Sequence, residues 1–338
     1  MLYRFKHFYY HLLRKILGDW NFFLYDEKKK EKRILHQYYT STNDCKNEDK
    51  YVIFMANGFS WHAGLCDRLK GIVTLYQWCK KNKTSFKIYF NTPFQLNKYL
   101  ITNMYNWEIE SQDICYNGKE VSVNHCMYNP LVYSFINDGT IFIKSQKWLN
   151  HHLNKNYKQI HVYTNIYPQS DYEFGTLFQE LFQPSPLLLH HLNKHSILIG
   201  GKYCSISFRF VQLLGDFRDC EGETLSIDAQ QHLIRESIKA IKDIKAINDN
   251  IPHLLVTSDS IKFLSVAAKI PYVYVIEGQI GHIDYDSSDE TAMKTFLDFF
   301  MIAKAEKVYL AKSEKMYNSD FARRASMIYH RPFELYEY

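Results

Sequence analysis

The sequence predicts an α/β protein with two Rossmann-like domains that face a cleft. Its 338 residues are more than one hydrophobic core usually serves, so two domains are expected. Apolar residues make up 46 % of the chain, which is enough for globular cores. Short runs rich in β-branched and aromatic residues alternate with helical patterns, most regularly after residue 196. This alternation is typical of βαβ units around a parallel sheet.

The expected elements follow one another in a simple order. In the first half they are a strand over 51–56, a helix over 64–80, strands over 86–90, 140–144 and 160–165, and a helix that ends at the PSP of 184–186. In the second half they are strand 203–210, helix 226–247, strand 253–259, helix 260–269, strand 272–277, helix 289–305, strand 307–311 and helix 313–327. We therefore expect an N-terminal domain over 36–195 and a C-terminal domain over 196–338, after a separate segment 1–35.

The segment 1–35 holds the excess positive charge. Its nine Lys or Arg and four Asp or Glu residues give +5, the net charge of the whole chain, so a nucleic-acid partner is not expected for the neutral body. Apolar residues recur at helical spacing within it, at Leu2, Phe5, Tyr9, Leu12, Leu13, Ile16 and Trp20. A basic amphipathic helix favours docking on the anionic inner face of a bacterial membrane. The alternative is a helix that packs on the protein body.

Two further features suggest a cytoplasmic protein that binds a membrane peripherally. No apolar run is long enough to span a bilayer, and no secretory signal is visible. The seven cysteines are odd in number and contain no CxxC pair, so we expect reduced thiols rather than a disulfide framework or a zinc ribbon.

Charged and hydroxylated residues follow the expected strands of the second half. Ligands of doubly wound sheets bind beyond the carboxyl ends of the strands, so these residues should meet at one edge. They are Arg209, Ser258, Asp259, His282, Asp284, Asp286 and Ser319. An arginine and a helix N-terminus bind pyrophosphate, and a carboxylate binds a ribose or a base edge. The sequence therefore predicts a nucleoside-diphosphate site, although it lacks the GxGxxG motif.

Several short blocks resemble motifs of the fucosyltransferase superfamily, which includes the nodulation-factor fucosyltransferase and the protein O-fucosyltransferases. GLCDRLKGI (64–72) is similar to its GLGDRLRGI turn, and SFRFVQLLGD (207–216) resembles its HxRxGD motif with Ser207 in place of the histidine. VTSDS (256–260) is similar to its TDS segment. The block 296–328 resembles its final motif through Asp298 and Ser319–Phe321.

The resemblance implies a GT-B glycosyltransferase that uses a GDP-sugar, above all GDP-fucose, and no metal cofactor. Arg209 would contact the diphosphate, Ser207, Ser258, Asp259, His282 and Asp298 would lie on the donor side, and Ser319 with the backbone at Asp320 and Phe321 would bind phosphate. Gly64, Asp67 and Arg68 would line the acceptor side, where a glycan or lipid-linked saccharide binds during polysaccharide synthesis. The longer spacing between Arg209 and Asp216 leaves the role of Asp216 open.

Asp67 is the candidate base for the acceptor hydroxyl, with His62 and His282 as less favoured ones. The adjacent His125 and Cys126 could also suggest a Cys–His nucleophile, but no sequence context supports it. Three alternatives stay open for the function. One is a non-catalytic protein that binds a nucleotide sugar or a glycan. Another is a scaffold that the N-terminal helix recruits to a membrane. The third is a metal-dependent GT-A transferase in which Asp284 and Asp286 form a DxD motif.

Overall fold

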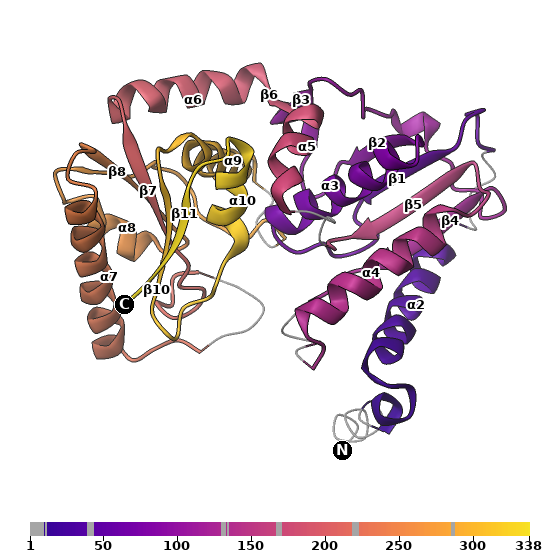
Figure 1. Cartoon of the computed structure of the whole chain (residues 1–338), viewed down its shortest axis with the longest axis horizontal. Coiled ribbons are helices and arrows are strands. Elements are labelled where there is room, and N and C mark those ends of the chain that lie inside the picture. The colour runs from indigo at the N-terminus through magenta and orange to yellow at the C-terminus, as the bar shows by residue number, and fades with distance from the viewer. Residues whose placement is uncertain are drawn as a thin grey trace. The chain divides into compact units, whose positions relative to one another are not determined.

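The computed structural model describes residues 10, 12–38, 44–129, 133, 135–166, 171–217, 223–284 and 288–338 (Figure 1). By packing, the chain divides into two compact units. Unit 1 comprises Met1–Thr92 and Tyr105–Asp171, and unit 2 comprises Pro93–Met104 and Tyr172–Tyr338. The sequence predicts a division near residue 196. Helices α5 (Phe174–Leu181) and α6 (Pro186–Ile199) belong with unit 2 because they pack on α10 (Asp320–Ile328) and α9 (Asp289–Lys304) of that unit.

Unit 1 contains a four-stranded parallel sheet in the order β2-β1-β5-β4. Its strands are β1 (Tyr51–Ala56), β2 (Ser85–Phe90), β4 (Val121–Cys126) and β5 (Gln159–Thr164). Its helices are α2 (Asp19–Tyr38), α3 (Leu65–Lys81) and α4 (Asp138–Leu153), with a short 3-10 turn at Ser111–Asp113. Helix α3 lies very close to the sheet at Gly71, where a Cβ atom would lie 2.0 Å from the carbonyl oxygen of Thr164.

Most expected elements of unit 1 are confirmed, and one is wrong. The strands over 51–56, 86–90 and 160–165 correspond to β1, β2 and β5. The expected strand 140–144 instead lies inside helix α4. This helix begins at its cap Asn137, whose side-chain oxygen accepts a hydrogen bond from the Thr140 amide at 2.7 Å. Such a cap stabilises the first turn against the β-propensity of the residues that follow.

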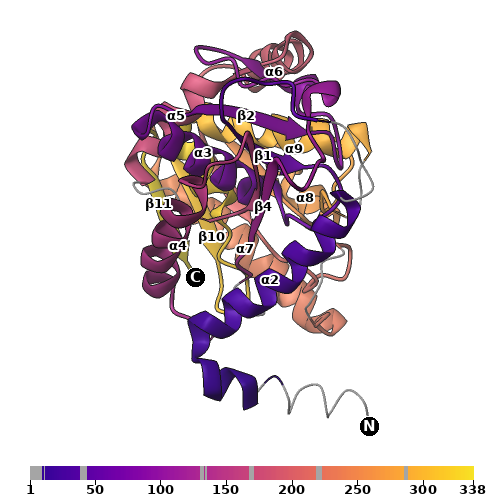
Figure 2. The ribbon, with the colours of Figure 1, turned by 90° about the vertical axis from the view of Figure 1, so that its right-hand side faces the viewer.

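Helix α2 packs on strand β4 and belongs to unit 1 (Figure 2). It buries five side chains, those of Phe22, Phe23, Glu27, Ile34 and Tyr38. Residues 12–17 form a helical turn that ends at Gly18, and Leu12 and Ile16 in it are 47 % and 70 % exposed. Leu2, Phe5 and Tyr9 of the expected apolar stripe lie outside the described residues. None of the described helices combines the length and apolar character needed to cross a membrane.

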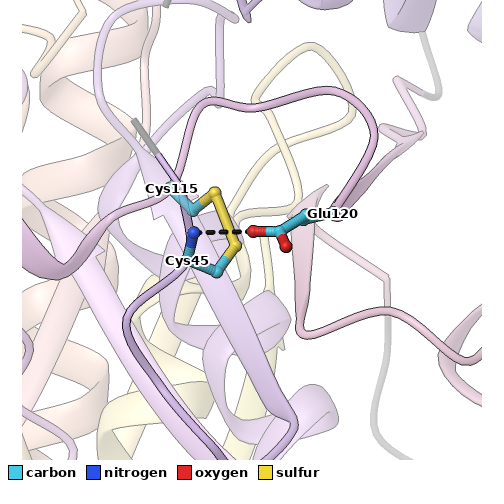
Figure 3. Close-up of side chains that lie close together, drawn as sticks. All are labelled: Cys45, Cys115 and Glu120. Atoms are coloured by element: carbon cyan, nitrogen blue, oxygen red, sulfur yellow. Dashed lines mark hydrogen bonds between the residues drawn. A yellow bond between two sulfur atoms is a disulfide. The ribbon is translucent and has the colours of Figure 1, made fainter. Parts of the chain in front are cut away.

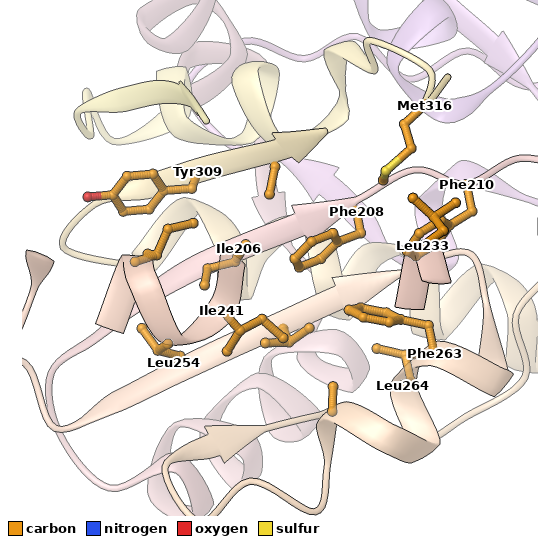
Figure 4. Packing of buried hydrophobic residues seen from close by; sticks show 14 of the residues in the cluster. Ile206, Phe208, Phe210, Leu233, Ile241, Leu254, Phe263, Leu264, Tyr309 and Met316 are labelled. Carbon is orange, nitrogen blue, oxygen red and sulfur yellow. The ribbon is translucent and has the colours of Figure 1, made fainter. Parts of the chain in front are cut away.

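Unit 2 is built on a five-stranded parallel sheet in the order β11-β10-β7-β8-β9. The strands are β7 (Tyr203–Phe208), β8 (His253–Ser258), β9 (Val273–Tyr274), β10 (Val308–Lys312) and β11 (Phe333–Glu337). The helices are α7 (Ile227–Ile247), α8 (Ile261–Ala267), α9 (Asp289–Lys304) and α10 (Asp320–Ile328). Ile206 and Phe208 of β7 pack with Ile241 of α7 and Phe263 of α8 in one core (Figure 4). Tyr203, on the other face, donates its hydroxyl to the Met301 carbonyl of α9.

The short segment Pro93–Met104 completes unit 2 from a distant part of the sequence. After a 3-10 turn at Leu96–Lys98, strand β3 (Leu100–Thr102) pairs antiparallel with β6 (Phe182–Pro184). The ring of Tyr99 stacks on Phe296 of α9, with centroids 4.9 Å apart, and its hydroxyl donates to Asp289. The segment is thus held by both backbone and side-chain contacts.

The expected strand–helix alternation of the second half is confirmed, with two shortened elements. The strand over 272–277 is reduced to Val273–Tyr274, and the helix over 313–327 begins only at Asp320. Its cap is Ser319, whose hydroxyl accepts from the Phe321 amide at 3.2 Å. Strand β11 and helix α6 were not expected.

Cys45 and Cys115 form a disulfide between segments 70 residues apart in sequence (Figure 3). Glu120 lies beside it and accepts a hydrogen bond from the Cys45 amide at 2.7 Å. The expectation of reduced thiols is wrong for this pair, because cysteines so far apart in sequence give no local motif. Cys66, Cys79, Cys126 and Cys204 are buried and lie outside this disulfide, and Cys220 lies outside the described residues.

Candidate functional site

Four loops meet around Arg209 at the carboxyl edge of the unit 2 sheet. Arg209 follows β7, and its Nη1 atom lies 3.1 Å from Oδ2 of Asp259, which follows β8. Its carbonyl oxygen accepts a hydrogen bond at 3.2 Å from the amide of Tyr317, in the loop after β10. The guanidinium also lies over the ring of Phe217, at 4.5 Å, and that ring contacts His282 of the loop after β9. The structure thus gathers the loops that the sequence placed at one edge.

Asp259 uses both carboxylate oxygens to hold the turn that carries Arg209. Oδ1 accepts from the Phe210 amide at 2.9 Å, and Oδ2 accepts from the Val211 amide at 2.7 Å as well as from Arg209. Burial raises the pKa of Asp259, while Arg209 and the two amides oppose this shift. Both carboxylate oxygens of Asp259 therefore have partners within the protein, and one of these partners is Arg209.

The turn after Arg209 is held in a strained conformation. Val211 has φ +55°, a region that β-branched residues rarely adopt. Such backbone strain persists only where surrounding contacts enforce it, as the two amide bonds to Asp259 do here. Arg209 is thereby fixed before any ligand binds.

Asp216 caps the start of helix α8. Its Oδ2 atom accepts from the Ser260 hydroxyl at 2.9 Å and from the Lys262 amide at 2.8 Å. The preceding Gly215 has φ +72°, a conformation that favours glycine. The Gly–Asp pair that the sequence left without a role therefore fixes the loop after β7 against α8.

The other residues expected on the donor side are found in different settings. Ser207 exchanges a hydrogen bond with Thr257 at 2.8 Å, and Ser258 lies 3.4 Å from Asp259. Because Ser319 caps α10 through the Phe321 amide, that amide is occupied by the cap, and the Phe321 ring packs on Phe299.

Asp298 lies inside helix α9 in a buried ion pair with Lys294. Burial raises its pKa, and the ion pair with Lys294 opposes this shift. Its Oδ1 atom is buried and has no hydrogen-bond partner among the described residues. Its described contacts thus join it to its own helix.

The candidate metal residues are only partly described. Asp284 donates its amide to Nδ1 of His282 at 3.3 Å, whereas Asp286 lies outside the described residues. Within the described part of the chain, the group of potential ligand atoms that comes together is that of Cys45, Cys115 and Glu120. Two of these are joined in the disulfide, so they offer no thiolate to a metal ion.

In unit 1, the N-terminal end of helix α3 contains the residues expected on the acceptor side. Gly64 is the N-cap residue, and Asp67 in the first turn forms an ion pair with Lys70 at 2.9 Å. The buried Arg68 donates to the Ala63 carbonyl and lies 5.6 Å from the Phe90 ring. The carboxylate of Asp67 is therefore already engaged by a cation of its own helix.

His62 is buried in the loop that precedes this helix. Its Nδ1 atom lies 3.1 Å from the Ser60 carbonyl, and Nε2 has no hydrogen-bond partner among the described residues. Burial, together with the neighbouring Arg68, lowers the pKa of His62 to about 3. At neutral pH this imidazole is a poor base.

A chain of three residues in unit 1 was not expected from the sequence. Oγ of Ser60 lies 2.7 Å from Nε2 of His125, and Nδ1 of His125 lies 2.7 Å from Oε2 of Glu27. Ser60 belongs to the turn between β1 and α3, His125 to strand β4 and Glu27 to helix α2. The sequence contained a partial signal in the His125–Cys126 pair, but Cys126 is buried and its pKa is raised well above the usual value by that burial. The partners of His125 come from distant segments.

Comparisons with known proteins establish the fold. No protein-family model and no curated protein sequence matches the chain. Among solved structures, NodZ alpha-1,6-fucosyltransferase soaked with GDP-fucose is similar with a TM-score of 0.53 and 12 % identity, over 83 % of this chain and 93 % of that chain. NodZ from Bradyrhizobium is similar with a TM-score of 0.52 and 11 % identity, over 82 % of this chain and 92 % of that chain. A mutant of Arabidopsis thaliana FUT1 in complex with GDP has a TM-score of 0.54 and 11 % identity, over 93 % of this chain and 78 % of that chain.

These likenesses agree with the two parallel sheets in two separate units. They do not support the metal-dependent GT-A alternative, because the matching structures are those of a different architecture. The chain therefore has the GT-B-like α/β fold of these fucosyltransferases.

Proposed function

We propose that the protein is a glycosyltransferase that transfers fucose from GDP-fucose to a hydroxyl group of a glycan or a lipid-linked saccharide. The observation that carries this proposal is Arg209, which Asp259 fixes where loops after β7, β8, β9 and β10 meet. The structures of similar fold support the choice of donor, since two of them were obtained with GDP-fucose or GDP.

In this proposal, Arg209 binds the diphosphate and stabilises it as it leaves. Cleavage of the glycosyl–phosphate bond develops negative charge on the β-phosphate, and a preoriented guanidinium lowers the energy of that state. Asp259 serves as a positioning residue, because its oxygens hold Arg209 and the two amides of the turn. Ser207, Ser258, His282, Asp298, Ser319 and Phe321 remain proposed donor-side residues.

No metal is needed for this scheme, because the guanidinium can neutralise the diphosphate. Gly64, Asp67 and Arg68 remain proposed residues of the acceptor side. The basic segment before α2 supports a further part of the proposal, namely that the enzyme acts at the anionic surface of a bacterial membrane during polysaccharide synthesis. Residues 1–17 hold four Lys or Arg and no acidic residue.

The test compares nucleotides and then follows turnover. Isothermal titration should show binding of GDP and GDP-fucose, and no binding of UDP or dTDP. Incubation with GDP-fucose should then release GDP, at a higher rate when a suitable saccharide acceptor from a panel is added. Binding of UDP alone would refute the proposal. Binding of GDP-fucose with no release of GDP in any condition would instead identify a non-catalytic nucleotide-sugar-binding protein.

A further inference from the structure

Unit 1 contains a chain of hydrogen bonds that connects a buried carboxylate to a half-buried hydroxyl. It runs from Glu27 through His125 to Ser60, with 2.7 Å at each step. Glu27 and His125 are 1 % and 2 % exposed, whereas Ser60 is only half-buried. This chain of hydrogen bonds therefore begins at the deeply buried carboxylate of Glu27 and ends at the hydroxyl of Ser60, which can reach a ligand.

The contacts of Glu27 determine which atom is the donor in each hydrogen bond of this chain. Its Oε2 atom also accepts from the Met127 amide at 2.6 Å, and its Oε1 atom accepts from Lys30 at 2.7 Å. Burial alone would raise the pKa of Glu27, but His125 and Lys30 outweigh it and the pKa is lowered. Glu27 is thus an ionised acceptor, which requires the proton of a neutral His125 to be on Nδ1. Nε2 is then the acceptor for the Ser60 hydroxyl.

We propose that Ser60, His125 and Glu27 form a proton relay that acts as the general base for the acceptor hydroxyl. This inference rests on the proposed glycosyl transfer and replaces Asp67 as the base. His125 is itself too buried to reach a saccharide, so Ser60 mediates the transfer. Ser60 belongs to the loop between β1 and α3 that also contains Gly64, and this loop is the proposed acceptor side.

The proposed step is balanced with the donor and the acceptor alone. The acceptor hydroxyl gives its proton to Oγ of Ser60 while Ser60 gives its own proton to Nε2 of His125. The acceptor oxygen forms a bond to the anomeric carbon, and the bond from that carbon to the β-phosphate oxygen breaks. GDP leaves with the electron pair, and the carboxylate of Glu27 stabilises the new imidazolium. Solvent then takes the proton from His125 by way of Ser60.

The ionisable groups around His125 decide how this relay depends on pH. They come from helix α2, strand β5 and the loop after β1, and they are Glu27, Lys30, Glu31, Tyr163 and His62. His62 stays neutral at working pH, and burial raises the pKa of Tyr163, which therefore also stays neutral. Glu27 is in direct contact with His125 through its ionised carboxylate. Its removal should therefore change the pH–rate profile most.

The test follows release of GDP from GDP-fucose, with water as the acceptor and then with the saccharide panel. Ser60→Ala should lower kcat at least about 100-fold, the range that general base catalysis supplies, while the Kd of GDP stays within twofold. Ser60→Thr, which keeps a hydroxyl, should recover part of the rate. Glu27→Gln should also lower kcat and move the acid limb of the pH–rate profile to lower pH, because an amide no longer stabilises the imidazolium.

Asp26→Asn is the matched control for Glu27→Gln. Asp26 is the neighbouring acid on α2, and it accepts from the Tyr133 hydroxyl at 2.6 Å without touching His125. This control should keep the wild-type pH profile. Ser60→Ala removes one half-buried oxygen, so it should fold, and thermal unfolding checks this for all variants.

The outcomes separate this proposal from the proposed function. If wild-type protein releases GDP and Ser60→Ala does so at the same rate, the relay is refuted and the transferase function stands. If Ser60→Ala is slow but Asp26→Asn shifts the pH profile as much as Glu27→Gln does, the assignment of Glu27 is refuted. If wild-type protein neither binds GDP nor releases it, the proposed function fails, and the relay fails with it as a base for glycosyl transfer.

Discussion

Replacement of Arg209 by Ala should separate nucleotide binding from folding. A hydrogen bond to a charged group contributes about 1.5–3 kcal/mol, so its loss should weaken GDP binding about ten- to a hundredfold. Loss of a donor that stabilises developing charge costs about 2.7–4 kcal/mol in the transition state, so kcat should fall about 100- to 1,000-fold. The larger effect on kcat follows because the leaving diphosphate carries more charge than the bound donor.

The same change should affect stability only moderately. Removal of one partner of a fully buried ion pair costs about 3–5 kcal/mol. The side chain of Arg209, however, is 23 % exposed, and Asp259 keeps its hydrogen bonds from the Phe210 and Val211 amides. We therefore expect a loss of about 1–2 kcal/mol in the free energy of unfolding, less than the fully buried case.

Calorimetric titration with GDP, GDP release and urea unfolding measure these three quantities. Arg209→Lys should give intermediate binding, because it keeps the charge but loses the planar fork. Arg235→Ala, at an exposed position on α7 of the same unit, removes the same charge and should leave all three unchanged. If Arg209→Ala bound GDP as wild type does, or if Arg235→Ala weakened binding equally, the assignment of Arg209 to the diphosphate would be wrong.

Four other expectations can be tested separately. In the proposed scheme Arg209 neutralises the diphosphate, so EDTA should leave GDP release unchanged; loss of activity that Mn²⁺ restores would contradict this. Burial lowers the pKa of His62 and of His161 to about 3, so below about pH 6.5 the unfolded chain gains protons that the folded chain does not. The unfolding free energy should then fall between pH 7 and pH 5 by about 2 kcal/mol per histidine, and equal urea midpoints at the two pH values would argue against it. Gly71→Ala should lower stability by about 1–3 kcal/mol in urea unfolding, since its Cβ would overlap the Thr164 carbonyl; the usual gain of about 0.5–1 kcal/mol for Ala in a helix would disprove that close approach. Deletion of residues 1–17 should leave GDP binding intact and reduce binding to phosphatidylserine vesicles, from which high salt should release the full chain; undiminished vesicle binding by the truncated protein would exclude this segment as the contact.

Local sequence patterns were sufficient to predict a strand or a helix where the segment is uniformly apolar or has a clear cap. YVIFMA became β1 over the same six residues, and the expected helix 226–247 became α7 with Ser226 as its cap. The strand expected at 140–144 failed because the pattern was read without its cap, Asn137. Strand β4 was missed because Ser122, Asn124 and His125 interrupt its apolar character.

These polar residues are acceptable in a buried strand because each finds a partner. Asn124 bonds to Ser122 and to His152 of α4, and His125 bonds to Glu27 and Ser60. His152, Glu27 and Ser60 are distant in sequence, so no local pattern could reveal these partners. The Cys45–Cys115 disulfide could not be predicted either, because its two cysteines are 70 residues apart in sequence.

The position of the candidate site around Arg209 could be predicted from the sequence, but the contacts of its residues could not. The carboxyl ends of parallel strands fix where Arg209 and Asp259 lie, and the structure brings them together. The sequence could not show that the carboxylate oxygens of Asp259 accept hydrogen bonds from the amides of Phe210 and Val211. Asp67 and Lys70 are three residues apart in one helix, a spacing that allows an ion pair. The sequence could not show whether Asp67 pairs with Lys70 or with the adjacent Arg68.

Unit 2 consists of two separate stretches of the chain, and this determines when it can finish folding during translation. Pro93–Met104 leaves the ribosome long before its partners, since β3 pairs with β6 and Tyr99 stacks on Phe296. Until α9 has been made, Tyr99 lacks the aromatic surface that covers it in the finished protein. A fragment that begins at Tyr172 would correspondingly leave β6 without its antiparallel partner and Phe296 without its stacked ring. The nascent chain must therefore keep this early segment available until the last third has been translated.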